Sequence, residues 1–132
     1  MEVEIFTLAD FAADYGQGKL VINGTFDNIV ANDFPAIHAS CAIVARIRIA
    51  NSEAGLHYFQ IDAINPQGEN FQEPFKGEFT VHKNPNADHN TLNIIWNLVH
   101  TRFDTPGKYA FEFYYDGEFR TGLSLTVGMQ QG

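Results

Sequence analysis

The chain is poor in the residues that mark disulfide-bonded, membrane-spanning and nucleic-acid-binding proteins. Cysteine occurs once in 132 residues, at Cys41, so no intramolecular disulfide can form. Basic residues are scarce, with 8 Lys and Arg against 16 Asp and Glu, and the formal charge of -8 repels phosphate backbones and anionic lipids. No apolar run approaches the roughly 20 residues of a membrane helix. We therefore expect neither nucleic acid nor a membrane as a partner.

Signals for secretion and for catalysis are also missing. Glu2 and Glu4 follow Met1 where a secretory signal has basic residues before an apolar core, which predicts a cytoplasmic protein. No serine lies in a G-x-S-x-G elbow, and no glycine-rich loop precedes a helix that would hold a phosphate. The sequence therefore predicts no enzymatic activity and no cofactor.

Short segments of alternating apolar and polar residues make up most of the chain, and no segment has helical periodicity. The clearest runs from His38 to Ile49, where an inward row includes Cys41 and predicts a buried, unreactive thiol. Other strands are predicted over Lys19 to about Ile29, Leu56 to Ile64 and Phe75 to Val81. Turn residues separate the strands throughout. We expect a single all-β domain over residues 1–132, an antiparallel β-sandwich of about seven to nine strands.

A hairpin is predicted from Lys108 to Val127, around an Asp-Gly turn. With a two-residue turn, the apolar face of one strand would meet the polar face of the other. A three-residue loop with a left-handed Gly117 instead pairs Phe113 with Phe119, so the two apolar faces coincide. We therefore predict a bulge at Gly117.

The residues just before this hairpin resemble a tyrosine corner. In the pattern Asp104-x-x-Gly107-x-Tyr109-x-Phe111, the Tyr109 hydroxyl is expected to bond to upstream backbone, as in immunoglobulin domains. The alternative is an ordinary aromatic residue at the start of a strand. The corner favours an immunoglobulin-like sandwich of Greek-key type.

Aromatic residues outside the inward rows are the first candidates for binding. Tyr58, Tyr114, Phe71 and Tyr15 are positioned to form a platform for a sugar ring or a partner protein. Tyr114 is the sharpest candidate, because the predicted pairing sets it beside Glu112 and diagonal to Arg120. The alternative is an exposed tyrosine favoured by strand propensity alone. The predicted binding residues are Tyr58, Tyr114, Glu112 and Arg120.

The loop after Val81 is the candidate metal site. His82 and His89 bracket this loop, and Asp88 would join them around a divalent ion. The alternative is an Asn-rich turn without a ligand.

Several stretches of the sequence resemble a family of small bacterial proteins known only as a domain of unknown function. The resemblance rests on Leu8-Ala9-Asp10-Phe11-Ala12, Gly18-Lys19-Leu20-x-Ile22-x-Gly24-x-Phe26-Asp27-x-Ile29, Phe34-Pro35 and Val44-Ala45-Arg46-Ile47. It implies a bacterial source and a sandwich fold, and it carries over no site residues.

Three functions follow as hypotheses. The first is a non-enzymatic protein-binding or interaction module, with self-association through a sheet face because the outward rows of two strands include Val44, Ile95 and Val99. The second is a carbohydrate-binding module that uses Tyr58 and Tyr114. The third is a metal protein or enzyme that uses the His82 to His89 loop.

Overall fold

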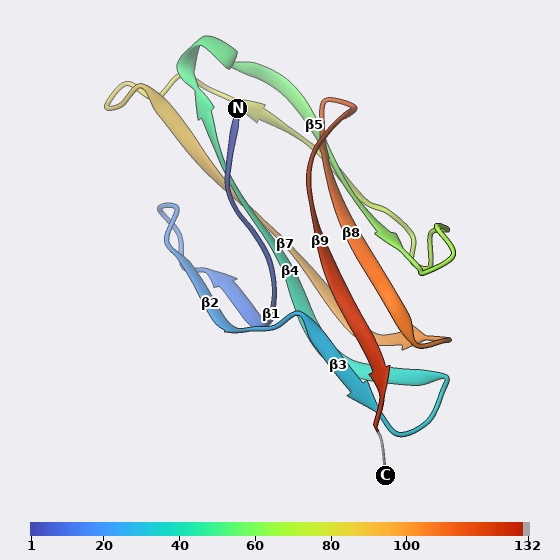
Figure 1. Cartoon of the computed structure of the whole chain (residues 1–132). Helices are drawn as coiled ribbons and strands as arrows, with labels where there is room; N and C mark the ends of the chain where they lie inside the picture. The colour runs from blue at the N-terminus through green and yellow to red at the C-terminus, as the bar shows by residue number, and fades with distance from the viewer. Residues whose placement is uncertain (131–132) are drawn as a thin grey trace.

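A computed structural model of the chain describes residues 1–130 and shows two β-sheets packed face to face (Figure 1). One sheet has the order β2-β1-β4-β7 and is formed by β1 (Glu2–Asp14), β2 (Leu20–Thr25), β4 (Ala36–Ala50) and β7 (His89–Phe103). The other has the order β3-β9-β8-β5-β6 and is formed by β3 (Asn28–Ala31), β5 (Gly55–Ile64), β6 (Phe75–Val81), β8 (Gly107–Tyr115) and β9 (Glu118–Met129). The short 3-10 helix η1 (Asn51–Glu53) precedes β5.

The predicted all-β sandwich is confirmed, with one correction to its strand directions. β3 pairs with β9 in parallel, so the sandwich is not wholly antiparallel. In the described residues, no helix is long and apolar enough to cross a membrane. The Greek-key, immunoglobulin-like assignment stays a prediction.

The core lies between the two sheets, where the alternating rows place it. On β4 the predicted inward row is buried from Cys41 to Ile49, and Trp96 of β7 stacks on Phe75 of β6 with ring centroids 5.5 Å apart.

The thiol of Cys41 lies in this core. Burial, assisted by the Asp10 carboxylate, raises the pKa of the Cys41 thiol to about 11. The thiol is therefore protonated and unreactive at neutral pH.

The β1–β2 hairpin covers part of the outer face of the first sheet. It forms a second, smaller apolar cluster in which Ala12, Ala42 and Val44 are buried against Leu20, Ile22 and Ile95. Arg46 Nη1 donates a hydrogen bond of 2.7 Å to the Gly18 carbonyl oxygen at the tip of the hairpin. Ala42 and Val44, two outward apolar residues of β4, are thus covered by the same chain.

The single strand predicted over Lys19 to Ile29 is wrong, because the chain changes sheets within it. β2 ends at Thr25 after pairing with β1, and β3 begins at Asn28 and pairs with β9 in the other sheet. An alternating pattern identifies the buried face of a strand, but it does not say which sheet the strand joins.

The three-residue loop predicted for the terminal hairpin is also wrong. The turn has two residues, Asp116 at φ 50° and Gly117 at φ 82°, and it pairs Tyr115 with Glu118. Two positive φ values are typical of a type I′ turn. The register then shifts so that Phe113 pairs with Thr121, and Arg120 is the extra residue of a bulge. The bulge therefore lies within β9, where it restores the match between the apolar faces.

The tyrosine corner is confirmed by its hydrogen bond. Tyr109 Oη donates to the Thr105 carbonyl oxygen at 2.7 Å, and only 2% of Tyr109 is exposed. Its ring also packs edge to face on Phe103 at 5.0 Å. The corner holds the turn before β8 against the core.

Candidate functional site

An open groove of about 980 Å³ lies on the outer face of the second sheet, over β5, β6 and the end of the β8–β9 hairpin. We call it the outer-face groove and define it by the side chains of Tyr58, Gln60, Asp62, Lys76, Glu78 and Tyr114. Asp116 and Gly117 of the β8–β9 turn close one end. A site of this kind combines apolar rings with a few polar groups, which is typical of ligand-binding surfaces.

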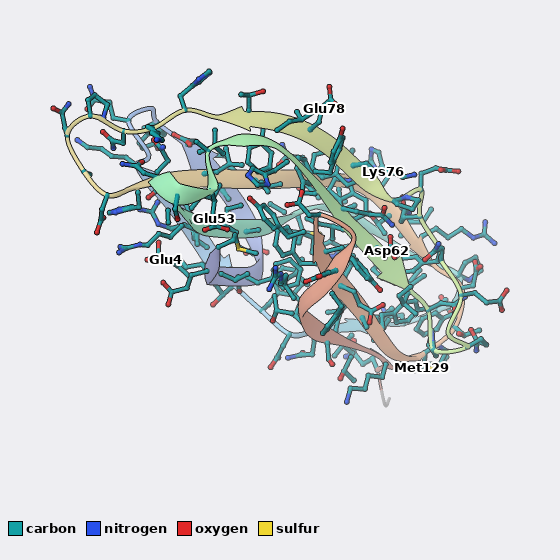
Figure 2. All side chains as sticks on the ribbon, turned by 90° about the horizontal axis from the view of Figure 1, so that it is seen from above. Glu4, Glu53, Asp62, Lys76, Glu78 and Met129 are labelled. Carbon is teal, nitrogen blue, oxygen red and sulfur yellow. The ribbon has the colours of Figure 1, made fainter. Side chains whose placement is uncertain are left out.

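Alternation along three neighbouring strands brings these side chains together. The inward residues of β5 are Phe59, Ile61 and Ala63, so the residues between them point outward. Gln60 lies opposite Lys76 on one side and opposite Tyr114 on the other, while Tyr58 lies opposite Glu78. Figure 2 shows Asp62 on β5 and Lys76 and Glu78 on β6. The groove is therefore a direct product of strand order and register.

Three aromatic rings are available at the groove. Tyr58 is 52% exposed, and Phe119 beside the groove is 55% exposed. Tyr114 is half-buried and meets Phe119 edge to face, with ring centroids 5.8 Å apart. Tyr58 and Tyr114 are diagonal neighbours on adjacent strands, a relation that places residues about 7–8 Å apart. Both rings therefore lie on the same outer face, and their role as a binding platform stays a prediction.

Polar groups surround the two tyrosines. Gln60 Nε2 donates a hydrogen bond of 2.7 Å to Asp62 Oδ1, which holds both side chains on the outer face. Partial burial, together with the carboxylates of Glu112 and Asp62, raises the pKa of the Tyr114 hydroxyl. That hydroxyl stays protonated near neutral pH and is able both to donate and to accept a hydrogen bond.

His57, whose side chain is largely buried, links the β8–β9 turn to β5 next to Tyr58. His57 Nδ1 lies 2.7 Å from Asp116 Oδ2, and His57 Nε2 lies 2.6 Å from the Glu53 carbonyl oxygen. Because both partners accept hydrogen bonds, the protonated ring donates to both of them. The other carboxylate oxygen of Asp116 accepts from the Tyr58 backbone N–H at 2.9 Å. The charged contact between His57 and Asp116 therefore holds in place the turn that closes one end of the groove.

The pKa values of this pair move in opposite directions. The Glu53 carbonyl and then the Asp116 carboxylate raise the pKa of His57 above its usual value. Burial acts to raise the pKa of Asp116, but the hydrogen bonds from His57 and the Tyr58 N–H outweigh it and lower that pKa. The folded state therefore favours the charged form of both groups.

Replacing His57 with glutamine is expected to make stability less dependent on pH. A raised histidine pKa stabilises the fold fully below the unfolded value of 6.5, and this contribution is lost as pH rises through the folded value. We expect His57→Gln to lower the free energy of unfolding by about 1–2 kcal/mol at acidic pH and by less at alkaline pH, as measured by urea unfolding.

The matched control is His89→Gln. His89 Nδ1 also contacts a carboxylate, Asp88 Oδ1, at 2.7 Å, but the Asp88 side chain is 97% exposed. Such an exposed pair contributes little. Equal pH profiles for wild type and His57→Gln between about pH 5 and pH 9 would show that the His57 contact carries no such stability.

The structure brings together some of the predicted binding residues and separates one. Tyr58 and Tyr114 share the outer-face groove, and Glu112 lies at its border, directly opposite Asp62. Arg120 lies elsewhere, in a depression formed with the first residues of β1, and its Nη2 is 3.5 Å from Glu118 Oε2. Arg120 is the extra residue of the bulge in β9 and does not line the outer-face groove.

The other two aromatic candidates lie outside the groove. Phe71 packs against the core, with its ring centroid 5.0 Å from that of Tyr109. Tyr15 is 70% exposed in the turn between β1 and β2.

Four residues of the groove were not predicted as site residues from the sequence: Gln60, Asp62, Lys76 and Glu78. Their outward position followed from alternation, but their grouping depends on β5 lying between β6 and β8.

The predicted metal residues do not converge. Asp88 and His89 contact each other, whereas His82 is exposed and its carbonyl oxygen accepts from Asn90 Nδ2. The loop is braced by Asn51, whose Nδ2 donates to the carbonyl oxygens of Asn84 and Ala87. Within residues 1–130, no group of three or more His, Cys, Asp and Glu side chains is arranged to hold a metal ion. Asparagine side chains therefore supply hydrogen bonds that hold this loop in shape.

Comparisons with known proteins give the fold and the family. No curated protein matches the chain. A crystal structure of a β-glucosidase from Listeria innocua in complex with isofagomine is similar, with a TM-score of 0.52 and 11% identity over 96% of this chain. The match covers 16% of that chain, so it shows a likeness of fold alone. A family model described as a family of unknown function, DUF6941, matches residues 4–128 and confirms the resemblance noted in the sequence. The chain therefore belongs to the DUF6941 family.

Proposed function

We propose that the protein is a non-enzymatic carbohydrate-binding module of the bacterial cytoplasm and that its ligand lies across the outer-face groove. The observation that carries this proposal is the placement of Tyr58 and Tyr114 on adjacent strands of one open face. Sugar rings have apolar faces that pack on aromatic rings, and hydroxyl groups that bond to amides and carboxylates. Gln60 and Asp62 supply such polar groups beside the rings.

The shape and lining of the groove support binding rather than catalysis. The groove is open along the sheet, so it does not enclose a ligand away from water as catalytic sites commonly do. The described residues that line it include no histidine, serine or cysteine. The one buried thiol of the chain, Cys41, lies in the core between the sheets. The exposed rings and polar side chains of this open face support recognition of a ligand.

Removal of the two tyrosine rings is expected to abolish most of the binding. We expect Tyr58→Ala and Tyr114→Ala each to weaken binding about 10-fold, and the double variant about 100-fold, because each ring contributes about 1.4 kcal/mol of contact. A glycan array probed with wild type and the double variant measures this loss. Tyr15→Ala is the control, since Tyr15 is exposed outside the groove. An array without any glycan retained by wild type, or with equal retention by the double variant, would contradict the proposal.

A protein-interaction module is the second candidate, because two aliphatic side chains remain uncovered on the first sheet. Ile37 of β4 is 65% exposed and Val99 of β7 is 64% exposed. They lie beyond the area that the β1–β2 hairpin covers, so they offer a small apolar contact for a partner or for a second copy. Sedimentation at high concentration tests the self-association, and a strictly monomeric protein would remove it.

A further inference from the structure

We propose that the outer-face groove selects oligosaccharides that carry free amino groups, which are cationic below neutral pH, over neutral oligosaccharides of the same length. This inference rests on the proposed carbohydrate-binding function and names the chemical class of its ligand. It is argued from the charges around the rings.

Carboxylates outnumber ammonium groups at the groove. Asp62 and Glu78 line it, and Glu112 borders it, whereas Lys76 is the one basic side chain among the described lining residues. Within residues 1–130, none of these four side chains forms an ion pair. Asp116 is a different case, because His57 and the Tyr58 N–H occupy its two oxygens. The free charges at the groove therefore favour a cation.

The register of β5 and β8 sets two of these carboxylates against each other. Asp62 lies directly opposite Glu112 on the outer face, and like charges in that position destabilise a sheet. Within residues 1–130, no basic side chain forms an ion pair with either of them. A cationic ligand would relieve the repulsion, so its binding is favoured by an interaction that a neutral ligand lacks.

The aromatic rings add to the preference for a cation. Tyr58 and Phe119 each present about half of their surface, and Tyr114 lies between Phe119 and Gln60. An ammonium group within about 6 Å of an aromatic centroid is attracted by the ring face. An amino sugar can stack its apolar face on one ring and place its ammonium group near the carboxylates. A neutral sugar makes only the first of these contacts.

Calorimetric titration with two matched probes tests the inference. The probes are a tetramer of glucosamine and the N-acetylated tetramer, which has the same length and no charge, at about pH 6, where amines of this kind are protonated. We expect the glucosamine tetramer to bind at least about 10-fold more tightly, with an advantage that shrinks as salt is added. The variant Asp62→Asn keeps the acceptor for Gln60 and removes one charge.

The variant Asp62→Asn tests whether charge, rather than shape, determines the preference between the two tetramers. We expect Asp62→Asn to weaken binding of the glucosamine tetramer about 3-fold to 10-fold and to leave the N-acetylated tetramer unaffected. Asp104→Asn is the control, because Asp104 is exposed at the β7–β8 turn. Equal or tighter binding of the N-acetylated tetramer would overturn the selectivity and leave the proposed function standing. Binding of neither tetramer, with an empty glycan array, would overturn both. Tighter binding of tetralysine than of the glucosamine tetramer would overturn the sugar in favour of a basic peptide.

Discussion

Truncation of Phe113 to alanine is expected to lower the free energy of unfolding by about 3–5 kcal/mol, whereas truncation of Phe119 is expected to cost less than about 1 kcal/mol. Phe113 has no exposed surface and packs against Phe6, with ring centroids 5.9 Å apart. Phe119 is 55% exposed and contacts Tyr114 on the outer face. The loss at Phe113 combines the removed apolar area with the cavity left between the sheets.

The comparison of the two phenylalanines tests the register of the terminal hairpin. The two-residue turn and the bulge at Arg120 place Phe113 inside and Phe119 outside, whereas a three-residue loop would pair the two on the same inner face. Urea unfolding, followed by the fluorescence of Trp96 as the single tryptophan, measures both variants. Losses of similar size at the two positions would contradict the observed register.

Substitution of Gly107 by alanine is expected to destabilise the fold by about 2–4 kcal/mol. Gly107 has φ 147°, a conformation that side chains rarely adopt, and an added Cβ would lie 2.6 Å from Cγ and 2.9 Å from Cβ of Pro66. The proline ring cannot move aside as a flexible side chain can. The substitution would therefore push the β5–β6 loop away from the turn that the Tyr109 corner holds.

Gly117→Ala is the matched control for Gly107→Ala. Gly117 also has a positive φ, 82°, but an added Cβ would meet no atom within 4 Å. We expect this variant to lose only about 1 kcal/mol, from backbone strain alone. Thermal unfolding of the two variants measures the difference. A loss at Gly107 no greater than the loss at Gly117 would show that the contact with Pro66 does not constrain the fold.

Strict alternation made much of the fold predictable. The inward row of β4 from Cys41 to Ile49 and the bounds of β6 match the sequence prediction, because a two-residue period defines which face of a strand is buried. Ala39, predicted at the start of that row, is exposed. The partners of a strand are not encoded in that period. The crossing from β2 to β3 and the position of the bulge at Arg120 depend on long-range pairing, and both were predicted incorrectly for that reason.

In the candidate site, too, the outward position of each residue was predictable from the sequence, whereas the grouping of the residues was not. Tyr58 and Tyr114 were predicted because each falls on the outward row of its strand, and the structure places both in one groove. The alternating pattern also placed Lys76 and Glu78 on the outward row of their strand. They lie beside the tyrosines only because β6 pairs with β5, and the sequence pattern does not encode that pairing. Arg120 was predicted from the register of the three-residue loop, so the bulge that corrects the register also removes Arg120 from the site.

An NMR titration of isotope-labelled protein with the glucosamine tetramer tests the role of the outer-face groove most directly. We predict saturable chemical-shift changes that concentrate at the backbone amides of Tyr58, Gln60, Lys76 and Tyr114, with the β1–β2 hairpin unchanged. These four residues belong to three adjacent strands of one sheet, so a single bound ligand would affect them together. Changes confined to the other sheet, or no change with either the glucosamine tetramer or the N-acetylated tetramer at millimolar concentration, would contradict a binding site at the outer-face groove.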